Sequence, residues 1–130
     1  GILIAHMAPP GTEVIAGLTQ DAQFGPVVMF GLGGVFVEVY RDVSFRLVPL
    51  TEPDAVAMIR EIKAFPILQG IRGGRSADLT ALADLLLTLS RMGQENPEIA
   101  EMDLNPIIVY EKGLSVVDAR VLLHHKAADA

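Results

Sequence analysis

The pattern of apolar positions changes near residue 50, from short apolar runs, which alternate with period two only just before that point, to recurrence every three or four residues. Before that point, residues 13–19 and 25–31 are apolar and β-branched with a polar turn between them, and residues 43–48 alternate apolar and polar side chains. These patterns predict β-strands, since side chains on successive residues of a strand point to opposite faces. Apolar runs at residues 2–8 and 35–40 predict further strand structure.

Two helices are predicted after the strands. The first begins at Thr51, a suitable N-cap, and ends before Pro66, which cannot continue a helix. The second begins at the N-cap Ser76, has Asp78 near its positive dipole end, and ends at Gly93. Its apolar stripe must face a sheet or a partner. The stripe consists of Leu79, Leu82, Leu86 and Leu89.

The C-terminal part predicts a second hairpin. Apolar runs at residues 99–110 and 114–117 are joined by Glu111, Lys112 and Gly113, a sequence suited to a tight turn. The resulting fold class is α+β, with a mainly antiparallel sheet and two helices.

Composition limits the domain count and the function. The 130 residues suit one folded unit or a piece of one, and 51% apolar residues with a mean hydropathy of +0.42 predict a sizeable core or a covered surface. A net charge of −6 disfavours nucleic acid and anionic membranes as partners. The absence of cysteine excludes disulfides and thiol chemistry and fits a cytoplasmic location. No apolar run reaches the length of a membrane span, and no signal peptide is expected.

The strongest candidate site combines Asp103 and Asn105, with Glu101 two residues earlier and Asp118 farther on. In a strand, residues 101, 103 and 105 share one face. If the turn at 111–113 folds the chain back, Asp118 comes close to Asn105, and hard oxygen ligands of this kind suit Mg²⁺. The alternative is that these are solvent-facing residues of a half-exposed strand.

Two glycine-rich loops are weaker candidates. Residues 31–34, which include Gly33 and Gly34, form either a backbone-lined anion site or a simple turn. Residues 70–75 place Arg72 in a loop before a helix start, as a phosphate-binding segment or a solvated loop. The histidines show no spacing matched to the carboxylates.

Five motifs, taken together and in order, carry a family resemblance that covers nearly the whole chain. The chain resembles the ATP-grasp portion of the NDP-forming acyl-CoA synthetases, and more weakly the succinyl-CoA synthetase β subunit. The motifs are residues 11–17, 21–38, 42–46 and 68–73, and the segment Asp103-Leu104-Asn105-Pro106 followed by Val117-Asp118-Ala119-Arg120.

The resemblance implies an activity and a set of site residues. An acyl-CoA, ADP and phosphate would be converted to a carboxylic acid, CoA and ATP through a phosphohistidine. Mg²⁺ would be held by Asn105 and Asp118 with Asp103 as a neighbour, and ATP or ADP would be the nucleotide. The implied nucleotide-binding residues are Glu13, Gly33, Gly34 and Arg72.

The same resemblance implies that residues 1–130 are the C-terminal ATP-grasp subdomain of a larger ligase. The N-terminal subdomain, the CoA-binding part and the phosphohistidine segment have no counterpart here, so we expect no catalytic residue in this chain and no activity of the chain alone. Those parts, and a second copy of the protein, are the expected partners. Two alternatives are a ligase-like regulatory region of a protein acetyltransferase and a noncatalytic subunit-interaction module.

Overall fold

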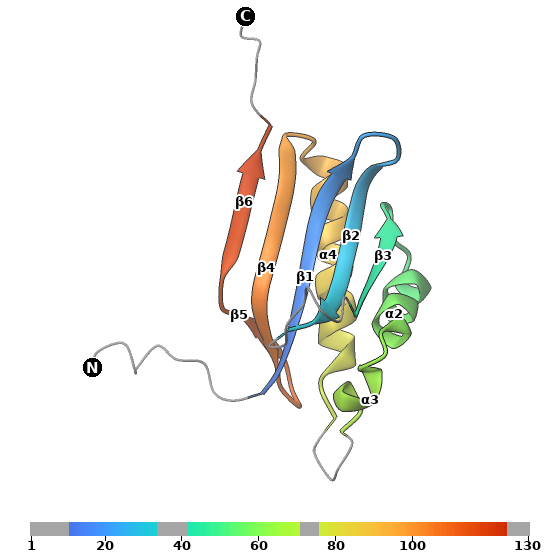
Figure 1. Ribbon diagram of the computed structural model, residues 1–130, viewed down its shortest axis with the longest axis vertical. Helices are drawn as coiled ribbons and strands as arrows, with labels where there is room; N and C mark the ends of the chain where they lie inside the picture. The colour runs from blue at the N-terminus through green and yellow to red at the C-terminus, as the bar shows by residue number, and fades with distance from the viewer. Residues whose placement is uncertain (1–10, 34–41, 71–75, 125–130) are drawn as a thin grey trace, which may run out of the picture.

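The computed structural model describes residues 11–33, 42–70 and 76–124. Its first two strands form a hairpin (Figure 1). They are β1, Thr12–Asp21, and β2, Gly25–Leu32. Asp21 Oδ1 accepts hydrogen bonds from the backbone N–H groups of Gln23 and Phe24, at 2.8 and 2.9 Å, and these bonds hold the pKa of Asp21 below its usual value. The polar turn predicted between the strands is therefore organised by its own aspartate.

Within the described residues, six strands form one antiparallel sheet with the order β3-β2-β1-β4-β5, and β6 also pairs with β4. The predicted antiparallel sheet is confirmed, but β6 was not expected as a separate strand. The remaining strands are β3 (Val43–Leu47), β4 (Ile99–Val109), β5 (Leu114–Val116) and β6 (Ala119–Leu123).

The helices cover one face of the sheet, and the longest of them runs behind the strands in Figure 1. They are α2, Glu52–Glu61, the short α3, Phe65–Leu68, and α4, Leu79–Glu95. Thr51 caps α2 as predicted, in a reciprocal capping box with Asp54. The stripe on α4 packs on the sheet of its own chain, since three of its leucines are at most 1% exposed: Leu82, Leu86 and Leu89.

Both predicted ends of the second helix were wrong. Asp78, and not Ser76, is the N-cap of α4, because its side chain accepts the N–H of Ala81 at 3.0 Å. Gly93 does not end the helix. It lies inside α4 because the helix packs closely on β1: a Cβ at this position would lie 2.9 Å from Leu18 Cδ1.

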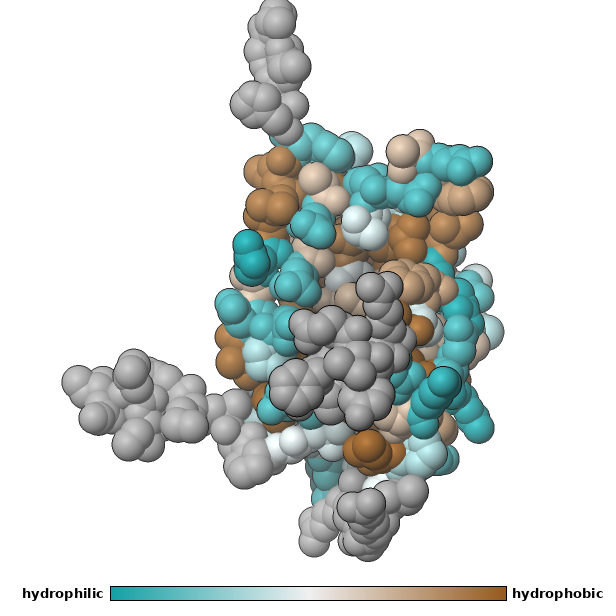
Figure 2. Space-filling view, viewed as in Figure 1, coloured by the Kyte–Doolittle hydropathy of each residue, from teal (hydrophilic) through white to brown (hydrophobic). Residues whose placement is uncertain are grey.

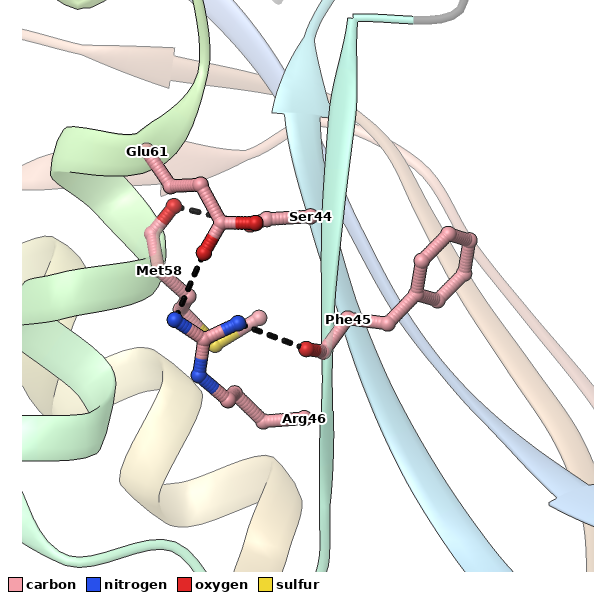
Figure 3. A network of polar contacts seen from close by, with 5 residues as sticks. All are labelled: Ser44, Phe45, Arg46, Met58 and Glu61. Atoms are coloured by element: carbon pink, nitrogen blue, oxygen red, sulfur yellow. Dashed lines mark hydrogen bonds and ion pairs between the residues drawn. The ribbon is translucent and has the colours of Figure 1, made fainter.

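Helix α2 is tied to the edge strand β3 by polar contacts (Figure 3). The buried Ser44 hydroxyl donates to the carbonyl of Met58 at 2.7 Å, and Arg46 pairs with Glu61 at 2.6 Å. These contacts fix the helix against the side of β3 that faces the core. The opposite side of the sheet, which presents Phe45, is left uncovered by the helices.

Asp78 also joins α4 to the β4–β5 turn. Its carboxylate accepts the N–H of Gly113 at 2.6 Å, which together with the Ala81 bond lowers its pKa. We expect Asp78→Ala to lower the Tm of the chain at pH 7, and Asp84→Ala, at an exposed position of the same helix, to leave it nearly unchanged.

The effect of Asp78 should depend on pH. A carboxyl group whose pKa is lower in the folded state stabilises the fold at pH values above its unfolded-state pKa, about 3.9. This stabilisation is lost as the pH falls through the folded-state pKa. The Tm difference between wild type and Asp78→Ala should therefore be full at neutral pH and shrink below about pH 4. Melting curves from pH 2 to pH 7 measure this, and a difference that stays constant over the range contradicts it.

Some predictions lie outside the described residues. These are the strand structure expected at 2–8 and 35–40 and the site residues Gly34 and Arg72. In the part of the chain that is described, every helix is too short or too polar to cross a membrane.

Candidate functional site

The predicted acidic residues lie on the face of the sheet opposite the helices, which we call the open face. In β4, Met102 and Leu104 belong to the core under the helices. Strand alternation therefore places Glu101, Asp103 and Asn105 on the open face, where Glu101 and Asn105 are exposed. The predicted shared face is confirmed.

A β-bulge follows this run. Val14 pairs with Ile107 and Ala16 with Leu104, so one residue of β1 stands opposite both Asn105 and Pro106, whose peptide bond is cis. Because β4 has one residue more than β1 at this point, the side chain of Ile107 lies on the core side of the sheet and not on the open face. The bulge ends the alternation directly after Asn105, as expected where a strand changes the direction of its side chains.

Asp118 lies directly across from Asn105, between β5 and β6. The N–H of Asn105 donates to the carbonyl of Asp118 at 3.1 Å, and the N–H of Val117 donates to the carbonyl of Pro106 at 3.0 Å. The expected fold-back of the chain is confirmed. In the described part of the structure, the Asn105 amide and the Asp103 and Asp118 carboxylates make no side-chain hydrogen bond or ion pair, so they remain available to a ligand.

The donor set is too small for a metal site built from protein alone. Across residues 11–33, 42–70 and 76–124, no group of three or more His, Asp or Glu side chains is placed to hold a metal ion. Two carboxylates and one amide oxygen instead fit Mg²⁺, which commonly takes one or two carboxylates and completes its shell with water and substrate phosphates.

Glu101 and Asp103 border a hollow of about 400 Å³ on the open face. One row of paired residues crosses it from strand to strand, and we call this the central row. Its apolar end is on β3 and β2, its charged end is on β4 and β6, and a glycine on β1 separates them. The row is Phe45, Met29, Gly17, Asp103 and Arg120.

Gly17 lets the floor of this hollow stay flat. A Cβ on Gly17 would lie 2.9 Å from the carbonyl oxygen of Met102, and backbone cannot move aside as a flexible side chain can. We expect Gly17→Ala to destabilise the chain by about 1–3 kcal/mol, the usual cost of overpacking. Urea denaturation measures this. Thr19→Ala, at an exposed position two residues along β1, is the control, and equal stability of both variants would contradict the close approach.

Two of the expected nucleotide-binding residues, Glu13 and Gly33, lie together farther along the same strands. The N–H of Gly33 donates to the carbonyl of Glu13 at 2.9 Å, which joins the end of β2 to the start of β1. The side chain of Glu13 is exposed. Glu13 is four residues from Gly17, or about 13 Å along the strand, so the two groups can contact different parts of one extended ligand.

Sequence reasoning missed Gly17 and Arg120 as members of this face. Arg120 follows Asp118 by two residues, and an apolar run of Val121, Leu122 and Leu123 follows it. This pattern could have been used to predict a strand at these residues. In Figure 2 apolar side chains gather along the upper part of β6, where these three residues are 48–63% exposed.

Comparison with known proteins gives a consistent result. The family described as ATP-grasp domain matches residues 1–123. The beta subunit of acetate–CoA ligase (ADP-forming) I from Pyrococcus furiosus is 54% identical over 123 residues, which is 95% of this chain and 53% of that protein. The beta subunit of ligase II from the same organism is 56% identical over 126 residues and is likewise covered to 53%.

Solved structures agree with the sequence matches. A dinucleotide-forming acetyl-coenzyme A synthetase from Ca. Korarchaeum cryptofilum, in complex with coenzyme A and Mg-AMPPCP, superposes with a TM-score of 0.88 at 60% identity. The match covers 91% of this chain and 55% of that chain. An ATP citrate lyase from Methanothrix soehngenii shares the fold at a TM-score of 0.56 and 17% identity. The chain therefore spans about half the length of the beta subunits it matches.

Proposed function

Because the chain belongs to the ATP-grasp domain family, we propose that residues 1–130 are the C-terminal nucleotide-binding subdomain of an NDP-forming acyl-CoA synthetase. Two kinds of similarity support this proposal. The beta subunits of two ADP-forming acetate–CoA ligases are more than 50% identical to it. The Korarchaeum synthetase that it superposes on was solved with a magnesium nucleotide analogue.

The proposed reaction belongs to the whole enzyme. Phosphate displaces CoA from an acyl-CoA to give an acyl phosphate, a histidine outside this chain takes the phosphoryl group and releases the carboxylic acid, and ADP then accepts the phosphoryl group to form ATP. This subdomain would hold the nucleotide during the last step. The remaining ATP-grasp subdomain and the CoA-binding part are the proposed partners, and the cytoplasm is the proposed location.

The observation that carries the proposal is that the backbone of Asp118 is bonded to the backbone of Asn105, two residues from Asp103 on the same face of β4. These three residues would hold the magnesium that accompanies the nucleotide. When bound, the ion neutralises charge on the phosphate oxygens during transfer. The three side chains would contribute oxygen donors next to the bulge, and the two carboxylates would hold the ion beside β4.

The remaining proposed contacts are to the nucleotide. Glu13 and Gly33 lie where β1 and β2 end, and Gly34 and Arg72 are proposed on the family resemblance alone. An exposed carboxylate such as that of Glu13 suits a hydroxyl donor on a ligand, since an ionised carboxylate only accepts hydrogen bonds. The N–H of Gly33 already donates to the carbonyl of Glu13, so within the glycine pair the N–H of Gly34 would be the donor to a phosphate oxygen.

The test is ATP formation by the full-length protein that contains this chain. We expect acetyl-CoA, ADP and phosphate to yield ATP in the presence of Mg²⁺, and we expect the 130-residue chain alone to yield none. Isothermal titration of the full-length protein with Mg-ADP tests the binding step separately. Absence of both ATP formation and Mg-ADP binding would overturn the proposal and favour a noncatalytic interaction module.

A further inference from the structure

The charged end of the central row combines an acidic cluster with one cation. Arg120 on β6 pairs in register with Asp103 on β4, and Glu101 lies in the next row, paired with Leu122. Residues directly opposite in an antiparallel pair point to the same face, so the Arg120 guanidinium and the Asp103 carboxylate share the border of the hollow.

Arg120 is distinguished from the other cations of the described residues by its place on the open face. The others lie on the helices, on the helix side of β3, or in connections, and Arg46 is already paired with Glu61. Those other lysines and arginines are Arg46, Arg60, Lys63, Arg91 and Lys112.

The Arg120 side chain is exposed, and within the described part of the chain it forms neither an ion pair nor a side-chain hydrogen bond. It stands beside Asp103 without the close contact of an ion pair, although both lie on the same border. A guanidinium group in this position keeps its full set of N–H donors for a ligand, and its planar fork matches two oxygens of a phosphate group.

The negative charge of the open face also favours a positively charged side chain near the ligand. Glu101, Asp103 and Asp118 would repel a nucleotide diphosphate if they acted alone, and one magnesium ion offsets only part of the charge of the combined carboxylates and phosphates. A guanidinium group on the strand next to the proposed metal ligands would supply the missing positive charge at the point where the phosphates lie.

We propose that Arg120 binds a phosphate group of the nucleotide, beside the Mg²⁺ held at Asp103, Asn105 and Asp118. This inference rests on the proposed function and adds a phosphate-binding residue to it. It also orients the ligand. The phosphates lie toward β4 and β6, and the apolar end of the central row, Phe45 and Met29, is left for the less polar part of the nucleotide.

The experiment is a binding titration on the full-length, unphosphorylated protein, in which the nucleotide carries the only phosphate present. For Arg120→Gln we expect Mg-ADP affinity to fall about tenfold to a hundredfold, the usual loss of a charge-assisted phosphate contact. Adenosine affinity should be unchanged, because adenosine lacks phosphate. Arg120→Lys should recover part of the Mg-ADP affinity through its charge. Arg91→Gln, on an exposed position of α4, is the matched control and should bind like wild type.

Three results would overturn the inference. Wild-type Mg-ADP affinity in Arg120→Gln would exclude a phosphate contact, even if turnover fell. An equal loss of Mg-ADP and adenosine affinity, or a lowered Tm of Arg120→Gln, would assign the residue a structural role in the β4–β6 pair. Failure of the wild-type protein itself to bind Mg-ADP would instead defeat the proposed function, so the two failures are distinguishable.

Discussion

Replacing Asp118 with Asn in the full-length enzyme is expected to lower turnover about a hundredfold or more at limiting Mg²⁺, with little change in Tm. The substitution keeps the shape of the side chain but removes a charged oxygen ligand, and a metal ion at a phosphoryl-transfer site contributes several kcal/mol to transition-state stabilisation. The carboxylate is exposed and makes no side-chain hydrogen bond or ion pair within the described residues, so its loss costs the fold little.

Asn105→Ala is expected to act in the same direction. If the amide instead satisfied local backbone groups, its truncation would cost about 1–3 kcal/mol of stability and would reduce activity only through unfolding. The structure favours the ligand role, since the Asn105 amide has no side-chain hydrogen bond among the described residues.

Magnesium titrations of turnover and melting curves on the same two variants separate these accounts, with Asp84→Asn on the exposed side of α4 as control. An unchanged magnesium dependence in both Asp118→Asn and Asn105→Ala would end the assignment of these residues as ligands. A large fall in Tm with normal magnesium dependence would favour the structural account.

The largest expected effect on stability comes from Leu86→Ala, at about 2–5 kcal/mol. Leu86 is 0% exposed at the centre of the α4 stripe, and its truncation leaves a cavity between the helix and the sheet. Val56→Ala, on a 41% exposed position of α2, is the control and should cost much less. Urea denaturation of the 130-residue chain measures both free energies of unfolding, and similar losses would contradict a core centred on α4.

Core packing also accounts for much of the high apolar content. The leucines of α4 are covered by the sheet of the same chain, so they do not indicate a missing partner. Most of the large apolar side chains left exposed lie on strands at the two edges of the sheet, including Phe45 and Leu47 on β3 and Leu122 and Leu123 on β6. We expect the proposed partner parts of the enzyme to contact these edge strands.

The local pattern determined the parts of this protein whose signals are short in range. Apolar and β-branched runs around a polar turn were sufficient for β1 and β2. Alternation with period two was sufficient for β3 and for the shared face of Glu101, Asp103 and Asn105. The Thr51 cap and the leucine stripe of α4 were also readable, because capping and helical periodicity depend on neighbours three or four residues apart.

Tertiary structure decided what depends on contacts between distant residues. Asp78 is the cap of α4 partly because Gly113, 35 residues away, donates to it, and Gly93 stays in the helix because Leu18 of β1 packs against it. The strand β6 exists through its pairing with β4, which carries Arg120 into line with Asp103. A sequence pattern records which side chains alternate, but only strand register, which is set by the whole sheet, determines which of them stand opposite one another.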